Sequence, residues 1–192
     1  MISVITVTYN NYDDLYRTLH SLDKVDGIES VVVNGGDCDK TKKLLSDFDG
    51  IAISELDKGI SDAFNKGVDL ATGENVMFLN SGDVLLSTDY LKEAEKIINF
   101  NPEISFIHSD LIYNDRISGD FRLTALQPFF FRTPPLGRGM PYHHQSMVVR
   151  KNVFDKTGMF NLRYKISMDF DWVCRLHNHS LNGYYWNDEQ VV

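Results

Sequence analysis

The chain has 192 residues, of which 43% are hydrophobic and 24% are charged, a composition typical of one soluble globular domain. It excludes a disordered, collagen-like or coiled-coil protein. The formal net charge is -8 and Lys and Arg form no cluster, so a nucleic-acid partner is not expected. Cys38 and Cys174 are far apart, and neither a signal peptide nor a membrane-spanning run is recognisable, so we expect a cytoplasmic protein.

Four apolar runs rich in Val and Ile alternate with helical patterns in the first half of the chain. This alternation is typical of an α/β protein with a parallel sheet and crossover helices. The predicted strands cover residues 3–8, 30–33, 51–56 and 76–79. The predicted helices begin near Asp13, Thr41 and Ile60, and a fourth passes through Leu91 and Ile98. Strand 76–79 is wholly apolar and is expected in the centre of the sheet.

The second half of the chain lacks this regular alternation. Strands are predicted over 105–112 and 147–149, and a helix is predicted to begin at 167–169. Between them lie an aromatic run at 129–131, expected in the core, and a loop at 133–141, expected to close over a bound ligand. Because no linker or repeat separates the halves, we predict one domain over residues 1–192.

Polar residues follow each of the first four predicted strands, and the carboxyl ends of parallel strands share one edge of the sheet. Carboxylates gathered at one edge repel each other, which favours a hard divalent cation that also binds phosphate oxygens. Lys58 could contact the same phosphates. For any single aspartate, however, capping a helix or shaping a turn is the more common role.

Other nucleotide and phosphate sites fit the sequence less well. Gly35 and Gly36 alone do not supply a dinucleotide-binding fingerprint, and no P-loop lysine is present. A phospho-receiver domain is an alternative, because Asp13 and Asp57 could mimic its acidic pocket. The segment around Asp110 lacks the lysine that such a pocket requires, and the second half of the chain is left unexplained.

Three motifs, in this order and with these gaps, resemble nucleotide-sugar-dependent family 2 glycosyltransferases. They are SVITVTYN at 3–10, ELDKGISDAFNKG at 55–67 and FLNSGD at 78–83, and HQS at 144–146 and MDFDW at 168–172 extend the likeness. The resemblance covers nearly the whole chain and is strongest to non-processive bacterial enzymes of polysaccharide assembly, of the colanic acid type. It implies a GT-A fold, which is a Rossmann-like, mixed, mostly parallel sheet flanked by helices.

The resemblance also implies a role for each matching position. Asp169 would be the general base that deprotonates the acceptor hydroxyl, and Asp83 would coordinate Mn²⁺ or Mg²⁺. The positions expected to bind the donor are Thr8, Tyr9, Asn10, Asn34, Asp37, Asp57, Lys58, Asp62, Ser81 and Gly82. The positions expected on the acceptor side are His144, Gln145, Asp171 and Trp172. From the residues alone, Asp169 is also explained as the N-cap of a helix.

Some positions depart from the family pattern or have simpler readings. Many relatives have an aspartate in place of Asn34 and a first carboxylate in place of Gly82. The processive signature QxxRW is missing, and the chain stops soon after Trp186, earlier than most relatives. Cys174, His177 and His179 do not match a zinc pattern and are expected to be structural or solvated. Tyr142 and Trp172 could stack on sugar rings.

The resemblance therefore predicts an inverting, metal-dependent transferase that moves a sugar from a nucleotide diphosphate, with UDP the expected nucleotide. The acceptor would be a glycan or a lipid-linked saccharide in cell-surface polysaccharide biosynthesis. Residues 1–100 would form the nucleotide-sugar-binding half and residues 101–192 the acceptor half. Peripheral contact with the inner face of the membrane is expected. The alternatives are a non-catalytic nucleotide-binding or scaffold protein on the same fold, and the phospho-receiver.

Overall fold

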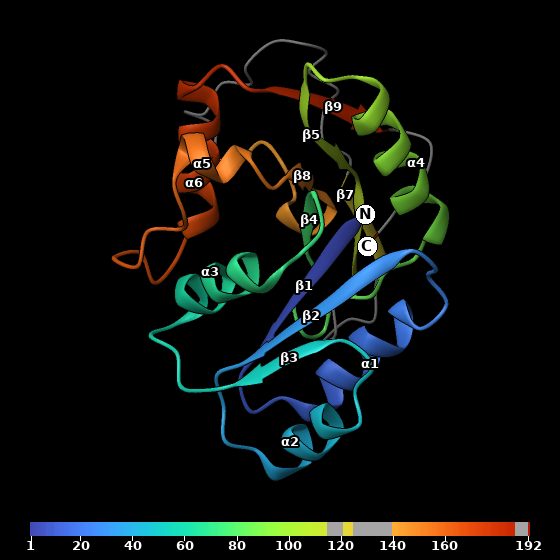
Figure 1. The fold of residues 1–192 in the computed structure, drawn as a ribbon, viewed down its shortest axis with the longest axis vertical. Coiled ribbons are helices and arrows are strands. Elements are labelled where there is room, and N and C mark those ends of the chain that lie inside the picture. Colours follow the sequence, from blue (N-terminus) through green and yellow to red (C-terminus); the bar gives the residue numbers. More distant parts are fainter. Residues whose placement is uncertain (115–120, 125–139, 187–191) are drawn as a thin grey trace.

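The computed structural model describes residues 1–114, 121–124, 140–186 and 192, and its centre is a seven-stranded mixed sheet (Figure 1). The strand order is β3-β2-β1-β4-β8-β5-β9. The strands are β1 (Ile2–Thr8), β2 (Ile28–Asn34), β3 (Ile51–Ser54), β4 (Asn75–Phe78), β5 (Ile104–Ser109), β8 (Val148–Arg150) and β9 (Asn182–Trp186). β6 (Leu111–Asn114) and β7 (Phe121–Thr124) pair with each other as a separate antiparallel ribbon.

Most neighbouring strands run parallel, and β8 is the exception in the sheet. β1 pairs in parallel with β2 and β4, β2 with β3, and β5 with β9. β8 is antiparallel to both β4 and β5. This arrangement confirms the predicted mixed, mostly parallel sheet, and β4 lies at its centre as expected.

Helices cover both faces of the sheet (Figure 1). They are α1 (Tyr12–Leu22), α2 (Asp39–Ser46), α3 (Ile60–Leu70), α4 (Thr88–Phe100), α5 (Val153–Thr157) and α6 (Met168–Asn178). Successive residues of β1 point to opposite faces, so Ile5 packs with α3, α5 and α6 while Val4 packs with α4. α1 and α2 cover β2 on the same side as α4. Burial on both faces explains why the central strands are rich in apolar residues.

Some predicted boundaries were wrong. The strand predicted over 105–112 is two strands, because β5 ends at Ser109 and the chain leaves the sheet at Asp110 to form β6. The strand predicted over 51–56 ends at Ser54. The aromatic run at 129–131 and most of the 133–141 loop lie outside the described residues. Within the described part of the chain, the helices are too short or too polar to cross a bilayer.

Candidate functional site

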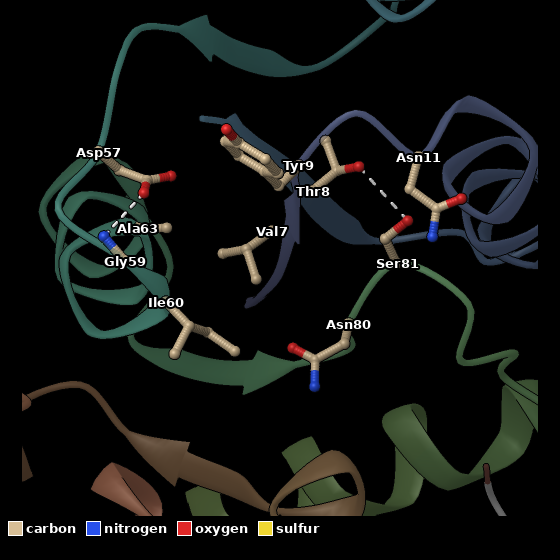
Figure 2. Close-up of a pocket in the computed structure, with 10 residues that line it drawn as sticks. All are labelled: Val7, Thr8, Tyr9, Asn11, Asp57, Gly59, Ile60, Ala63, Asn80 and Ser81. Carbon is tan, nitrogen blue, oxygen red and sulfur yellow. Dashed lines mark hydrogen bonds between the residues drawn. The ribbon is translucent and has the colours of Figure 1, made fainter. Parts of the chain in front are cut away.

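A pocket of about 540 Å³ opens at the edge of the sheet where β1 and β4 end (Figure 2). The lining residues come from the end of β1, the start of α3 and the segment after β4: Val7, Thr8, Tyr9, Asn11, Asp57, Gly59, Ile60, Ala63, Asn80 and Ser81. Ligand pockets commonly measure roughly 300–1,000 Å³, and in open α/β sheets they lie outside the carboxyl ends of the strands. The pocket therefore has the size and the place of a ligand site.

Two larger hollows lie elsewhere on the described surface. One, of about 750 Å³, contains Glu74, Arg150 and Lys151, near the beginning of β4. The other, of about 700 Å³, lies between α1 and α2 and contains Tyr16 and Lys43. Neither contains a residue that the sequence marks as donor-binding, so we assign the candidate site to the pocket at the carboxyl edge.

The loops around the pocket are packed tightly against one another. Asn10 Oδ1 accepts the backbone N–H of Asp37 at 2.8 Å. A Cβ atom at Gly35 would collide with the carboxylate of Asp57, and one at Gly36 would collide with Asn10. These glycines therefore let the loops after β1, β2 and β3 approach closely, as the shared edge predicted.

Asn34 shapes one of these loops and is fully covered. It has no exposed surface. Its Nδ2 donates to the Gly36 carbonyl and to the Ser54 hydroxyl, both at 3.2 Å, and its Oδ1 accepts the Gly36 N–H at 3.0 Å. The nucleoside contact expected of Asn34 is therefore not available in this structure. Asp37 is exposed instead, and its ion pair with Lys42 lowers the pKa of its carboxyl.

Two carboxylates brace the start of α3. Asp57 Oδ1 accepts the Gly59 N–H at 2.8 Å, and Asp62 Oδ2 accepts the Lys58 N–H at 3.0 Å. Asp62 also lies 3.6 Å from the Lys66 ammonium. Asp57 lines the pocket while the Lys58 side chain is exposed at its margin. Both aspartates therefore shape the turn that leads into α3, a structural role that the sequence left open.

The segment after β4, residues 80–83, is a tight turn that we call the 80–83 turn. The Asp83 N–H donates to the Asn80 carbonyl at 2.9 Å, and Asp83 Oδ2 accepts the Asn80 N–H at 3.2 Å. Gly82 has φ of 107°, and its N–H donates to Thr18 Oγ1 at 2.9 Å. Burial raises the pKa of Asp83, and the nearby His144 opposes that rise. Asp83 is thus a half-buried carboxylate directly beside the pocket wall.

The antiparallel strand β8 brings a histidine to this turn. Met77 of β4 pairs with Val148 of β8, so residues just before β8 lie opposite residues just after β4. His144 Nε2 lies 3.1 Å from Asn80 Nδ2. On the other side of the ring, His144 Nδ1 lies 3.1 Å from Asp169 Oδ2. Asp169 is thereby connected to Asn80, a residue of the pocket lining.

Asp169 occupies the second position of α6. The N-cap of that helix is Ser167, which has φ of 58°, so the alternative that Asp169 caps the helix was wrong. Asp169 Oδ1 accepts the N–H of Phe170 at 2.9 Å. The hydrogen bond from His144 lowers the pKa of Asp169 against the opposing effect of burial. Asp169 is therefore held ionised, as a proton acceptor must be.

The acceptor-side positions have mixed environments. Asp171 pairs with Arg175 at 2.9 Å, and Arg175 also donates to the Thr157 carbonyl. Trp172 is 3% exposed and its ring stacks on Phe154 at 4.8 Å. The expectation that Trp172 stacks on a sugar ring was therefore wrong, because its ring is part of the core.

Tyr142, Gln145 and Cys174 are also away from the pocket lining. Tyr142 is 8% exposed and packs against His108 at 4.6 Å, which likewise leaves no ring face for a sugar. Gln145 lies in the short 3₁₀ helix η2 (His144–Ser146) and is half-buried. In the part of the chain that is described, no cluster of three His, Cys, Asp or Glu side chains could hold a metal, and this includes the surroundings of Cys174.

Sequence reasoning missed several residues of the site. Asn80 was part of a quoted motif but received no role, although it lines the pocket and contacts His144. Asn11, Ile60 and Ala63 also line the pocket. The apolar stripe of α3 could have indicated Ala63, because that stripe faces the end of β1. Nothing in the spacing of Asn80 and His144 indicates their contact, which depends on the direction of β8.

The residues present fit a divalent cation that takes most of its ligands from a substrate. Mg²⁺ is usually bound through one or two carboxylates together with substrate phosphates, rather than by a complete protein cage. Asp83 offers one such carboxylate, and burial makes its negative charge unfavourable without a cation. A cation held by Asp83 would have to share its remaining positions with water or phosphate oxygens.

The ionisation of Asp169 leads to a prediction on stability. Because its pKa in the folded protein is below the ordinary value of 3.8, the carboxylate stabilises the fold at pH values above 3.8. This contribution is lost as the pH falls through the lowered pKa. We expect Asp169→Asn to reduce the free energy of unfolding near neutral pH, and the difference from the parent to shrink between about pH 5 and pH 2.

Urea denaturation at several pH values measures this difference. Asp89→Asn is the matched control, since Asp89 holds the same second position in α4 but is exposed. A deficit in Asp169→Asn that stays constant over the whole pH range would contradict the lowered pKa of Asp169.

Comparison with known proteins agrees with this geometry. Residues 3–166 match the model of the family described as Glycosyl transferase family 2. A PGL/p-HBAD biosynthesis glycosyltransferase of Mycobacterium bovis is 31% identical over 186 residues, covering 91% of this chain and 69% of that protein. The Escherichia coli enzyme WfaP, a UDP-Glc:alpha-D-GlcNAc-diphosphoundecaprenol beta-1,3-glucosyltransferase, is 24% identical, covering 85% of this chain and 64% of that protein.

Solved structures share the fold at low sequence identity. TarS 1-349 of S. aureus in complex with UDP has a TM-score of 0.76 and 18% identity over 99% of this chain. The mannosyltransferase PcManGT of Pyrobaculum calidifontis, in complex with GDP-Man and Mn²⁺, has a TM-score of 0.74 and 18% identity over 100% of this chain. The chain spans 59% of that TarS chain and 56% of the PcManGT chain. The family match and the sheet together establish that this chain belongs to glycosyltransferase family 2 and has the GT-A fold.

Proposed function

We propose that this protein is an inverting glycosyltransferase that moves a sugar from a nucleotide diphosphate, UDP in the first instance, to a hydroxyl of a glycan or lipid-linked saccharide. The observation that carries the proposal is the contact between Asn80, which lines the pocket, and His144, which holds Asp169. The ionised carboxylate lies two hydrogen bonds from the lining of a ligand-sized pocket, which supports the proposal. The UDP complex of TarS and the UDP-Glc donor of WfaP support UDP as the nucleotide.

The donor would lie across the ends of β1 and β4. Thr8 and Ser81 line the pocket from these two strands, with their hydroxyls 3.4 Å apart, and Tyr9 is 68% exposed beside them. On the opposite wall, Asp57 and the start of α3 line the pocket. The N–H groups at the beginning of a helix favour negative charge, which suits a diphosphate.

Asp83 is the residue proposed to hold Mn²⁺ or Mg²⁺. When bound, the cation would neutralise the charge that develops on the departing diphosphate. PcManGT, which shares the fold, is in complex with Mn²⁺, and this supports the choice of cation. Gly82 supplies no second carboxylate, so Asp83 is the only ligand in the 80–83 turn with a charged side chain.

The reaction is a single displacement at the anomeric carbon. Asp169 removes the proton of the acceptor hydroxyl as its oxygen forms the new bond to the sugar. The bond to the diphosphate oxygen breaks on the opposite face, and its electron pair leaves with the nucleoside diphosphate. Attack opposite to the leaving group inverts the anomeric configuration. A positioned base of this kind typically contributes roughly 10²- to 10⁴-fold to the rate.

The non-catalytic alternative rests on Gly82 in place of a carboxylate, and the same assays separate it from an enzyme. A scaffold would bind UDP without releasing it from any UDP-sugar. The phospho-receiver is set aside by the family membership.

The base assignment predicts a loss of turnover. We expect Asp169→Asn to lower UDP release from a UDP-sugar by roughly 10²- to 10⁴-fold, because the amide cannot accept the acceptor proton. A panel of UDP-sugars with Mn²⁺ and a mixture of glycan acceptors supplies the measurement. Asp89→Asn should retain turnover, and an Asp169→Asn variant as active as the parent would refute the base role.

The metal assignment predicts a change in nucleotide affinity. UDP should bind the parent more tightly with Mn²⁺ than with EDTA, as measured by titration calorimetry. With Mn²⁺ present, Asp83→Asn should bind UDP at least roughly 10- to 100-fold more weakly than the parent. This is the loss in metal affinity that follows when a residue supporting a metal ligand is removed. Its affinity in EDTA should equal that of the parent, which serves as the internal control. Equal Mn²⁺ enhancement in both proteins would exclude Asp83 as the ligand.

Peripheral contact with an anionic membrane surface is part of the proposal, since a lipid-linked acceptor lies there. All residues from Asn161 to Ser167 are exposed, and among them Ile166 is 83% exposed beside the basic Arg163 and Lys165. Ser61 Oγ donates to the Tyr164 carbonyl at 3.0 Å, which ties this segment to the start of α3. Apolar and basic side chains together favour an anionic lipid interface.

Vesicle cosedimentation tests this contact. We expect binding to vesicles that contain phosphatidylglycerol, and we expect Arg163→Glu with Lys165→Glu to weaken it by about 1 kcal/mol per basic residue removed. Phe100→Ser is the control, because Phe100 is 80% exposed on α4 far from the pocket. Equal loss in the control, or no binding by the parent, would remove the membrane contact from the proposal.

A further inference from the structure

His144 joins two parts of the site that are far apart in sequence. It stands at the start of η2, between the 80–83 turn and α6. The position of η2 is fixed by Ser146, whose Oγ donates to the Ser109 carbonyl at 2.6 Å and accepts the Ser109 N–H at 3.1 Å. The Tyr90 hydroxyl donates to the Ser146 carbonyl. The imidazole is therefore presented from a rigid support.

The neighbours of the ring determine which nitrogen carries the proton. The Asn80 amide presents its nitrogen, a donor, to His144 Nε2 at 3.1 Å, so in this orientation Nε2 is the unprotonated acceptor. The proton of a neutral ring then sits on Nδ1, which donates to Asp169 Oδ2 at 3.1 Å. The structure thus selects the Nδ1–H tautomer, whereas free histidine in water favours Nε2–H.

We propose that His144 is a positioning residue: Asp169 keeps the proton of its imidazole on Nδ1 while Asn80 donates to Nε2, and the neutral ring orients the Asp169 carboxylate and ties it to the 80–83 turn beside the donor pocket. The proposal rests on the proposed function for the role of Asp169. It adds that the base and the donor-side turn are connected through two hydrogen bonds. It assigns Asn80 the task of keeping the ring neutral by donating to Nε2.

The environment of the ring supports this assignment. The ionisable side chains that interact with His144 are Asp169 from α6 and Asp83 from the 80–83 turn, while Phe64 of α3 meets the ring edge at 6.2 Å. The His144 hydrogen bond is the largest cause of the lowered pKa of Asp169. His144 and Asp169 are only 23% and 26% exposed, so water competes weakly for the bond.

A competing arrangement must be distinguished. Asn80 Oδ1 is buried and has no hydrogen-bond partner among the described residues. If the amide were rotated by 180°, Oδ1 would face Nε2 and require a proton there. Nδ1 would still need its proton to bind Asp169, so the ring would be an imidazolium. The two arrangements differ in one proton, which is directly measurable.

The decisive experiment is a long-range ¹H–¹⁵N correlation spectrum of the histidine rings in the full chain at neutral pH, without ligand. The loss of one signal in His144→Asn identifies His144. We expect Nδ1 of His144 to be protonated and Nε2 unprotonated, and the exposed His179 to show the ordinary tautomer. In Asn80→Leu, which removes the donor, Nδ1 should keep its proton because it still faces the Asp169 carboxylate, while the ¹⁵N resonance of Nε2 should move. An Nε2–H ring or an imidazolium in the parent would overturn the proposal.

Kinetics test the positioning role with a matched pair of variants. The amide nitrogen of Asn at position 144 can replace Nδ1–H, whereas Leu cannot. We expect His144→Leu to lower kcat for UDP release by about 10- to 100-fold with KM for the donor within about twofold, and to move the acidic limb of the kcat profile to higher pH. His144→Asn should restore much of kcat and the profile.

The outcomes separate the two claims. If the parent releases no UDP, the proposed function fails while the spectrum still decides the tautomer. If the parent is active and both variants lose kcat equally with an unchanged pH profile, His144 has only a structural role and the proposal is wrong. If His144→Leu does not fold, the parent spectrum and Asn80→Leu decide.

Discussion

The direction of β8 is the constraint on which the candidate site depends. β8 is antiparallel to β4, so the segment that enters β8 meets the segment that leaves β4 at the same edge of the sheet. His144 precedes β8 and Asn80 follows β4, and their side chains come within hydrogen-bond distance. A parallel β8 would have put His144 at the opposite edge. At this edge, residues of the second half of the chain therefore meet residues of the first half.

The first half of the fold could be predicted because its signals are local. The runs of β1, β2 and β4 are rich in apolar residues, although β1 and β2 contain a few polar ones, and each ends in turn residues. Parallel strands with crossover helices then bring Thr8, Asp57 and Ser81 to one edge without further information. The tight approach of these loops was also implicit in Gly35 and Gly36, although their partners Asp57 and Asn10 were not.

The second half could not be predicted to the same depth, because its contacts are set by tertiary structure. The chain leaves the sheet at Asp110 although the apolar pattern continues into β6. Trp is a residue type that often stacks on sugars, but Trp172 lies on the inner face of α6 and packs in the core against Phe154. Asn is a residue type that often binds ligands, but the side-chain amide of Asn34 is hydrogen-bonded to the backbone of Gly36 in its own turn. Residue type alone does not separate these roles.

The backbone at Gly82 limits how the protein could be redesigned. A designer who wished to recreate the paired acidic motif of many relatives would place aspartate at this position. A φ of 107° is poorly suited to any residue with a side chain, at a cost of about 1–3 kcal/mol. The exchange would also risk moving the amide that Thr18 receives. A second acid at this position therefore requires a different turn.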